Sequence, residues 1–350
     1  MPLDDAAKQC TAEPWNLLNV YRPEDVLEME ASANLTSQGE SLQFTYTVRV
    51  ACRKSSARPI SRPFTIVSER LKLTGGRFQD TVLLENLEGK VKLLHEKAFL
   101  AGYVSGTEFV AATAPTESTM LFRLYDLETN PRANLFKRYL DSWGYYSLDA
   151  GQMRSNVATP MDRGMDAFGS NLCSVLYTLH NERPRDERKL VEAAKLIEPR
   201  LDLISFQSPD RDHVYMFFED KDGHRFGVQN VSDGTLRFLA ICFLIISNRT
   251  DEPSEAVSPL IMIEEPENGI FVEHLKPLIE KIDPSGRQGQ FLFTSHNPYF
   301  IDLFDGTLDG LHMVRSLGSY SSVSKPDGAQ LTQRLGKFSL GELHFRGLLG

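Results

Sequence analysis

Two short apolar runs, each ending in a cluster of polar residues, constrain the fold of this chain most. Residues 260–263 run into 264–269 (EEPENG), and residues 291–293 run into 294–298 (TSHNP). Apolar runs of this length are typical of strands buried in a parallel sheet. Parallel strands deliver their carboxyl ends to one edge of the sheet, where α/β folds bind ligands. We therefore predict an α/β fold with both polar clusters at one edge.

A third motif precedes these two. Residues 231–235 (VSDGT) open a long apolar segment that predicts a helix, with Ser232 as its N-cap residue. About 30 residues separate Ser232 from Glu265, and about as many separate Glu265 from His296, which is the length of one strand–crossover–strand unit. Each motif alone has a plainer explanation: a helix cap, a solvated strand end or a structural histidine. Their order and spacing together favour one site that acts on a phosphate.

Composition narrows the class of protein. Hydrophobic residues make up 41% of the 350, which is ordinary for a globular chain, and the net charge of −9 argues against a surface coated by nucleic acid. The four cysteines form no CxxC pair, so neither a disulfide framework nor a zinc site is indicated. The N-terminus has no signal-peptide core, and no apolar run is long enough to span a membrane. We predict a cytoplasmic protein without a membrane partner.

The N-terminal part has a different pattern from the rest. Residues 42–50 alternate apolar and polar side chains, residues 64–73 read as their antiparallel partner, and a hairpin is predicted over 81–94. A short helix is predicted near residues 24–30, and a β-rich tail after the last motif. We divide the chain into an N-terminal β lobe (1–94), an insertion of uncertain structure (95–165) and a C-terminal lobe (166–350) with the three motifs.

These motifs resemble those of a known family, the ABC-type ATPase heads of the SMC/RecF-like class. Segment 232–237 (SDGTLR) resembles their signature motif, 263–269 (IEEPENG) their Walker B and D-loop, and 294–298 (TSHNP) their switch histidine. More narrowly, residues 160–350 are similar to stand-alone bacterial AAA family ATPases with RecF-like heads, including GSNL at 169–172 and SLGEL at 339–343. The resemblance implies a P-loop NTPase-type head with a mostly parallel sheet, ATP and Mg²⁺ as cofactors, and dimers of heads.

The resemblance also implies a role for each residue of the catalytic group. Glu265 would activate the attacking water, and Glu264 would hold Mg²⁺, since hard cations prefer oxygen ligands. Most ABC proteins carry Asp at the position of Glu264, although this narrower group often has Glu. His296 would contact the γ-phosphate.

Four further residues are implied in contacts between subunits. Ser232, Asp233 and Gly234, at the start of a helix that suits an anion, would meet a nucleotide bound by the opposite subunit. Asn268 would belong to the D-loop between the subunits.

One expected motif does not occur in the chain. The 350 residues contain no G-x-x-x-x-G-K-[ST] phosphate loop. In the family this loop precedes strands like residues 42–50, so we expect the chain to start after it, as a truncated or degenerate head. Without the amides and lysine of the loop, we expect weak ATP binding and little hydrolysis by this chain alone.

Three functions remain open from the sequence. The first is an ATP-hydrolysing ABC-type head in DNA repair or phage defence, acting as a homo- or heterodimer with DNA, a toxin or a nuclease as partner. The second is a non-catalytic head that donates its signature motif to a partner. The third is the ATPase part of an OLD-type nuclease system, which we disfavour because no nuclease-like acidic cluster follows His296.

Overall fold

The computed structural model describes most of the chain, in two compact units. The described residues are 26–37, 39–52, 64–103, 109–113, 116–124, 128–154, 162–210, 213–247, 259–282, 289–318 and 321–349. The first unit comprises residues 1–141 and 316–321, and the second 142–315 and 322–350. The division at residues 94 and 165 stays a prediction.

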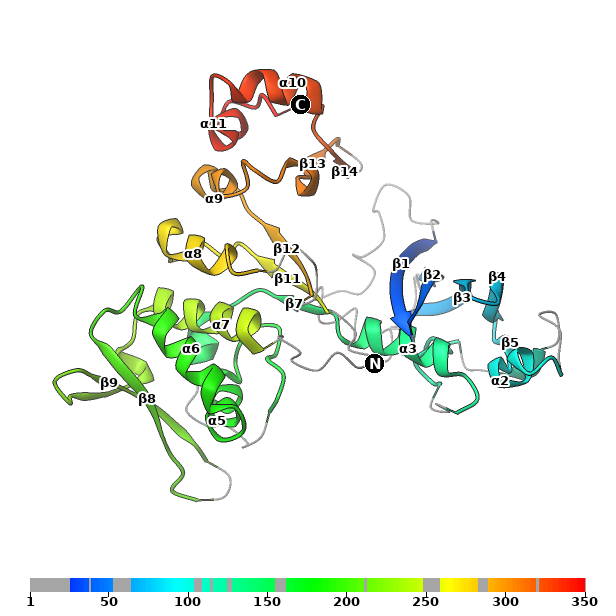
Figure 1. The fold of residues 1–350 in the computed structure, drawn as a ribbon, viewed down its shortest axis with the longest axis horizontal. Coiled ribbons are helices and arrows are strands. Elements are labelled where there is room, and N and C mark those ends of the chain that lie inside the picture. The colour runs from blue at the N-terminus through cyan, green and yellow to red at the C-terminus, as the bar shows by residue number, and fades with distance from the viewer. Residues whose placement is uncertain are drawn as a thin grey trace, which may run out of the picture. The chain divides into compact units, whose positions relative to one another are not determined.

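The first unit is built on a six-stranded antiparallel sheet in which strands consecutive in the chain are neighbours (Figure 1). Its elements are β1 (Leu27–Ser37), β2 (Glu40–Cys52), β3 (Phe64–Gly75), β4 (Phe78–Leu87), β5 (Lys90–Leu94), α2 (Glu96–Leu100), β6 (Phe109–Thr113) and α3 (Pro131–Asp141). The predicted antiparallel strands are confirmed. The helix predicted near residues 24–30 is wrong over residues 27–30, because the segment from Leu27 pairs with β2 along its whole length, and cross-strand pairing outweighs local helix propensity. Residues 24 and 25 lie outside the described part of the chain.

The alternation read from the sequence places the core of this unit on one face of β2. Five alternate residues of β2 are buried: Leu42, Phe44, Tyr46, Val48 and Val50. Phe136 of α3 is fully buried and stacks on Phe44 with 5.2 Å between the ring centroids. Each such aromatic side chain contributes about 2 kcal/mol by its burial, and this contact packs α3 against the sheet.

A buried carboxylate caps α3 from another element. Both oxygens of Glu96, in α2, accept hydrogen bonds from the first free amides of α3, those of Arg132 (2.8 Å) and Ala133 (2.9 Å). Burial raises the pKa of Glu96 to about 7, against the lowering effect of these two amides and of the Arg132 charge. A raised folded-state pKa means that this carboxyl stabilises the fold fully below its unfolded pKa, and that the contribution is lost as the pH rises through about 7.

We expect Glu96→Gln to flatten the pH dependence of stability. Between pH 5 and 8 the wild-type chain should lose on the order of 3 kcal/mol of unfolding free energy through this group, whereas the amide cannot ionise. Urea unfolding at several pH values measures the difference, with the exposed Glu30→Gln as the control. Equal slopes for wild type and Glu96→Gln would contradict the assignment.

The second unit contains a three-stranded parallel sheet that carries the motifs. Its order is β12 (Gln290–Thr294), β11 (Leu260–Glu264), β7 (Gly144–Tyr146). Ile263 of β11 pairs with Phe293 of β12 in parallel register and with Tyr146 of β7 on its other side. The predicted adjacency of the two motif strands is confirmed, and with it the α/β fold. Strand β7 was not predicted, because three residues are too few to show a period.

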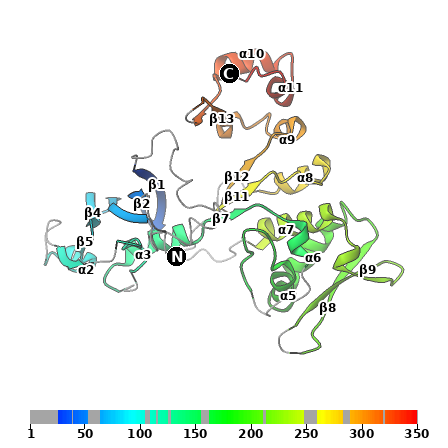
Figure 2. The same cartoon turned by 180° about the vertical axis from the view of Figure 1, so that it is seen from behind.

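Helices and a hairpin complete the core of the second unit. The elements are α4 (Ala150–Met153), α5 (Leu172–Glu182), α6 (Pro184–Ala194), β8 (Leu201–Gln207), β9 (Tyr215–Asp220), β10 (Arg225–Gly227), the 3₁₀ turn η2 (Val228–Asn230), α7 (Asp233–Ser247) and α8 (Val272–Ile279). Figure 2 shows the β8–β9 hairpin beside α5 and α6. Helix α7 is apolar around its whole circumference and is buried, as the apolar run after Ser232 predicts.

The chain ends in small helices and one short hairpin. These elements are α9 (Pro298–Asp302), η3 (Leu308–Gly310), β13 (Met313–Ser316), β14 (Ser321–Ser324), α10 (Gly328–Leu335) and α11 (Leu340–Phe345). The prediction of a β-rich tail is wrong, because Ser339 caps α11 and a separate apolar cluster that includes Leu331 and Leu343 packs these helices together. Among the described residues, no helix has the length and apolar character needed to cross a membrane.

Candidate functional site

The carboxyl ends of β11 and β12 bring two of the predicted residues to one edge of the sheet. The backbone N–H of Glu265 donates to the carbonyl of Thr294 at 2.9 Å, so the two chains are still paired where the polar clusters begin. Two residues beyond Thr294 lies His296, which is exposed. The geometry that the spacing predicted is therefore present at the level of the backbone.

Glu265 lies in a sharp turn with a strained backbone. Its φ is +42°, a left-handed conformation that costs a non-glycine residue about 1–2 kcal/mol. Asn268 holds the turn, since its backbone N–H donates to the Glu265 carbonyl (3.0 Å) and its side-chain amide donates to Glu265 Oε2 (2.7 Å). Such strain is concentrated at functional sites, and here the two hydrogen bonds with Asn268 hold Glu265 in the strained conformation.

Glu264 is held as a carboxylate. The hydroxyl of Tyr145, on β7, donates to Glu264 Oε2 at 2.6 Å. Hydrogen bonds from Tyr145 and Ser147 keep the pKa of Glu264 below its usual value. An exposed, ionised oxygen donor at a sheet edge fits a hard divalent cation such as Mg²⁺. Tyr145 could not be identified from the sequence, because its strand is too short to be predicted.

A small polar pocket lies between the two glutamates and α7. It has a volume of about 70 Å³ and is lined by Ser147, Leu148, Arg237, Glu264, Glu265, Pro266 and Asn268. Pockets that enclose small organic ligands measure about 300–1,000 Å³, so this one has room for an ion, water and part of a phosphate group. It does not enclose a whole nucleotide.

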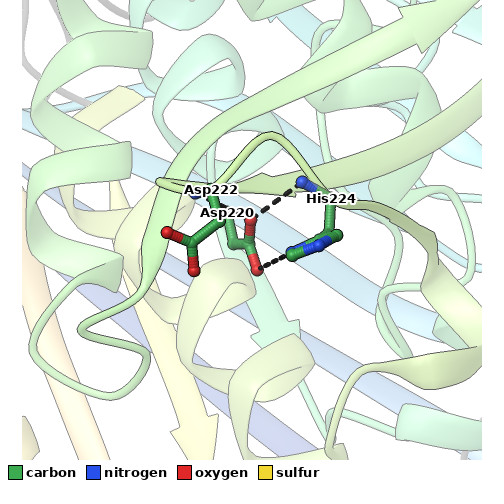
Figure 3. Close-up of side chains that lie close together, drawn as sticks. All are labelled: Asp220, Asp222 and His224. Carbon is green, nitrogen blue, oxygen red and sulfur yellow. Dashed lines mark hydrogen bonds and ion pairs between the residues drawn. The ribbon is translucent and has the colours of Figure 1, made fainter.

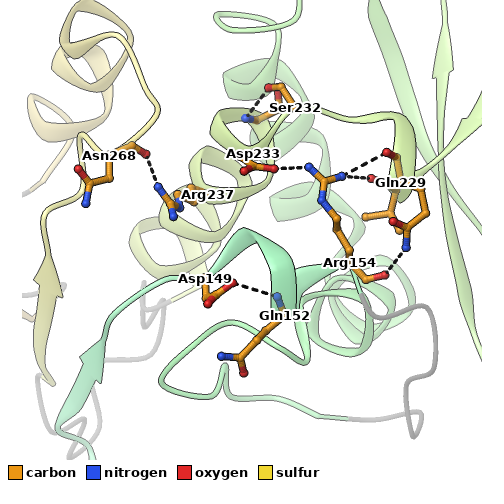
Figure 4. A network of polar contacts seen from close by, with 10 residues as sticks. Asp149, Gln152, Arg154, Gln229, Ser232, Asp233, Arg237 and Asn268 are labelled. Atoms are coloured by element: carbon orange, nitrogen blue, oxygen red, sulfur yellow. Dashed lines mark hydrogen bonds and ion pairs between the residues drawn. The ribbon is translucent and has the colours of Figure 1, made fainter.

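The N-terminus of α7 has the cap that the sequence predicts. Ser232 Oγ accepts from the backbone N–H of Thr235 at 3.1 Å, as Figure 4 shows in part. The plainer explanation of Ser232 as a helix cap therefore holds, and its hydroxyl is already engaged. Ser232 is exposed, which leaves this end of the helix, with its partial positive charge, open to an anion.

Asp233 is committed to an ion pair within the chain. Its carboxylate binds the guanidinium of Arg154, which also donates to the carbonyl of Val228 at 2.9 Å (Figure 4). The side-chain amide of Gln229 in turn donates a hydrogen bond to the carbonyl of Arg154 at 2.9 Å. Asp233 thus fastens the start of α7 to the residues after α4. Arg154 was not singled out from the sequence.

Gly234 is required by close packing against the turn after β11. A Cβ at Gly234 would lie 2.1 Å from the carbonyl oxygen of Gly269, a distance that no side chain permits. One helical turn further on, Arg237 Nη1 donates to the carbonyl of Asn268 at 2.9 Å (Figure 4). The signature-like helix start and the segment that resembles a D-loop therefore form one surface.

His296 is not part of the polar pocket. The residues beside it are tied down: Ser295 Oγ donates to Glu267 Oε1, and Asn297 Oδ1 accepts from the backbone N–H of Tyr299 to cap α9. The structure explains why the SLGEL segment carries a glycine, because a Cβ at Gly341 would lie 2.0 Å from the carbonyl oxygen of Pro298. The tail thus supports the helix that follows His296.

One other group among the described residues has the composition of a metal site. Asp220, Asp222 and His224 gather at the β9–β10 turn, with their ligand atoms within 4.8 Å of one another (Figure 3). Asp220 Oδ1 accepts the backbone N–H groups of Asp222 and His224, and Arg200 binds both carboxylates. This is the hydrogen bonding of a tight turn, already balanced by a cation.

Comparison with known proteins gives one family. The family model described as "AAA domain, putative AbiEii toxin, Type IV TA system" matches residues 83–302. No curated protein matches the chain.

Solved structures of SMC heads are distantly similar. The SMC head domain from Thermotoga maritima is 11% identical, with a TM-score of 0.30, over 82% of this chain and 74% of that chain. The Smc head with an extended coiled coil bound to the C-terminal domain of ScpA, derived from Pyrococcus furiosus, is 9% identical, with a TM-score of 0.34, over 85% and 80%. An SmcHead bound to the C-winged helix domain of ScpA gives 11% and 0.35, over 83% and 76%.

Proposed function

This chain belongs to the AAA-domain family, and from that premise we propose that its second unit is a cytoplasmic ABC-type ATPase head that works with Mg²⁺ and together with a second head. The observation that supports this most is the pairing of β11 with β12, which sets Glu264 and Glu265 beside a polar pocket at the carboxyl edge of the sheet. Phosphoryl transfer requires mainly positioning and charge stabilisation, and this edge offers both.

Each residue has a role in this proposal. Glu265, aimed by Asn268, orients the attacking water and takes up its proton. Glu264, with its lowered pKa, holds Mg²⁺, and the ion would neutralise charge on the transferred phosphate. His296 is the group that meets the γ-phosphate, from the exposed position after β12.

We propose that the nucleotide is held between this chain and a second head. The 350 residues contain no phosphate-loop pattern, and the pocket of about 70 Å³ is too small for ATP. The exposed start of α7, with Ser232 and Gly234, and Asn268 beside it form a surface suited to phosphates that another subunit holds. We therefore propose that this chain presents its signature surface to a P-loop-bearing partner, in addition to the catalytic residues that it contributes itself.

Phosphate release with and without such a partner tests the proposal. The purified chain with Mg²⁺ and ATP should release little phosphate, whereas adding a homologous head that carries a P-loop should raise release above that of the homologue alone. Turnover of roughly 1 s⁻¹ by the chain alone, lost in Glu265→Gln, would overturn the donor proposal and favour self-sufficient catalysis. No stimulation of the homologue would also count against the donor role.

A further inference from the structure

Glu267 is a buried carboxylate to which neither the sequence motifs nor the proposed catalytic roles assign a function. It lies in the turn between Glu265 and Gly269, and only 7% of the residue is exposed. Its Oε1 accepts from the hydroxyl of Ser295, while its Oε2 is buried without a hydrogen-bond partner among the described residues. Burying a carboxylate with only one of its oxygens hydrogen-bonded is energetically unfavourable, so the presence of this group needs a structural explanation.

The Ser295 hydroxyl links this carboxylate to the backbone on both sides of His296. Ser295 Oγ donates its proton to Glu267 and accepts the backbone N–H of Asn297 at 3.0 Å. A serine whose oxygen accepts the amide two residues on closes a tight turn. Because the hydroxyl has one proton and donates it in the hydrogen bond to Glu267, the lone pairs of its oxygen are directed toward the backbone N–H of Asn297. His296 is the residue enclosed by that turn.

The far side of the turn is fixed separately. Asn297 caps α9, and the carboxylate of Asp302 in α9 accepts the backbone N–H of Gly341 at 2.6 Å. His296 is thus held between a helix that the tail supports and a serine that Glu267 orients. His296 itself is exposed, and the backbone that carries its side chain is the backbone of this turn.

We propose that Glu267, through Ser295, is the positioning residue that sets the direction of His296 at the edge of the sheet. Glu267 does not touch the reacting atoms in this role. The proposal rests on the proposed function for its meaning in catalysis, but the positioning itself is a property of the protein without nucleotide. It also connects the segment beside α7 with the histidine, because Glu267 precedes Asn268 and Gly269 in one turn.

The imidazole signals of the chain labelled with ¹³C-histidine test the positioning directly. Loss of a signal in His296→Gln identifies His296. Glu267→Ala and Ser295→Ala should both shift and broaden that signal to a similar extent, and the double variant should do no more than either one. Glu267→Gln and Ser295→Thr retain the acceptor and the hydroxyl and should restore the wild-type signal. His213 and His224, in another part of the unit, and the exposed Glu273→Ala serve as controls for the fold.

An unchanged His296 signal in both alanine variants would overturn the proposal, as would additive changes in the double variant. If Glu267→Ala fails to fold, Ser295→Ala carries the same test, since Ser295 is only partly buried. In the mixed-head assay, the alanine variants should lower kcat about 10-fold or more with little change in KM, because they misplace a group that would contact the reacting phosphate. If no mixture turns over ATP, the proposed function fails, and the histidine signals still decide whether Glu267 positions His296.

Discussion

Ser232→Arg is expected to abolish the ATP-dependent heterodimer between this chain and a P-loop-bearing head. Ser232 is exposed at the start of α7, beside the turn that ends at Gly269. An arginine there removes the hydroxyl that caps Thr235, which costs about 1 kcal/mol, and fills the surface that would face the partner's nucleotide. Light scattering of the mixture with ATP, with the partner's catalytic glutamate changed to glutamine to trap closure, measures the loss.

Two serine variants separate the cap from the surface. Ser232→Thr retains an oxygen for the cap and should retain the heterodimer, whereas Ser232→Ala loses the cap without adding bulk and should weaken dimerisation only in part. Thermal unfolding of each variant shows whether α7 is still formed. A heterodimer that persists in Ser232→Arg, or ATP-dependent dimers of this chain alone, would rule out the donor surface.

The fold was predictable where a period or a spacing was long enough to read. The alternation in residues 42–50 and the apolar runs before Glu264 and Thr294 predicted strands that the structure contains, in the expected pairing. Two errors have a common cause. The segment from Leu27 and the tail helices are decided by the partners they pack against, and a single sequence does not show which segments meet.

The candidate site was predictable in its motifs but not in its supports. Glu264 ends β11, and Glu265 and His296 follow the ends of β11 and β12, whose register places these ends at one edge. The supporting contacts join residues far apart in the sequence, so no local pattern predicts them. They are made by Tyr145, by Arg154 and by the pair Glu267 and Ser295. The family resemblance assigns Gly234 to contact with a nucleotide of the opposite subunit, whereas within the chain a glycine is needed there because the carbonyl of Gly269 packs against it.

Glu265→Gln is expected to lower the phosphate release that this chain adds to that of the homologous head by at least 100-fold, because Glu265 is the proposed water-activating carboxylate. General-base assistance is worth about 10²–10⁴ in rate, and glutamine has the shape of glutamate without its basicity. Glutamine can still accept the hydrogen bond from Asn268, so the strained turn at φ +42° should survive. Phosphate release at saturating ATP measures the effect, and thermal unfolding should show a midpoint close to that of wild type.

Two companion variants decide whether the loss belongs to the base. Glu264→Gln should instead raise the Mg²⁺ concentration needed for half-maximal turnover, because it weakens an ionised ligand that Tyr145 holds in place. The exposed Glu273→Gln, on α8, should change neither quantity. If Glu265→Gln retains full turnover in the mixture while the homologue's own glutamate proves essential, then this chain contributes only its signature surface. The Glu265 carboxylate beside the pocket would then take part in no catalytic step, and the strained backbone at Glu265 would serve only to close the turn against α7.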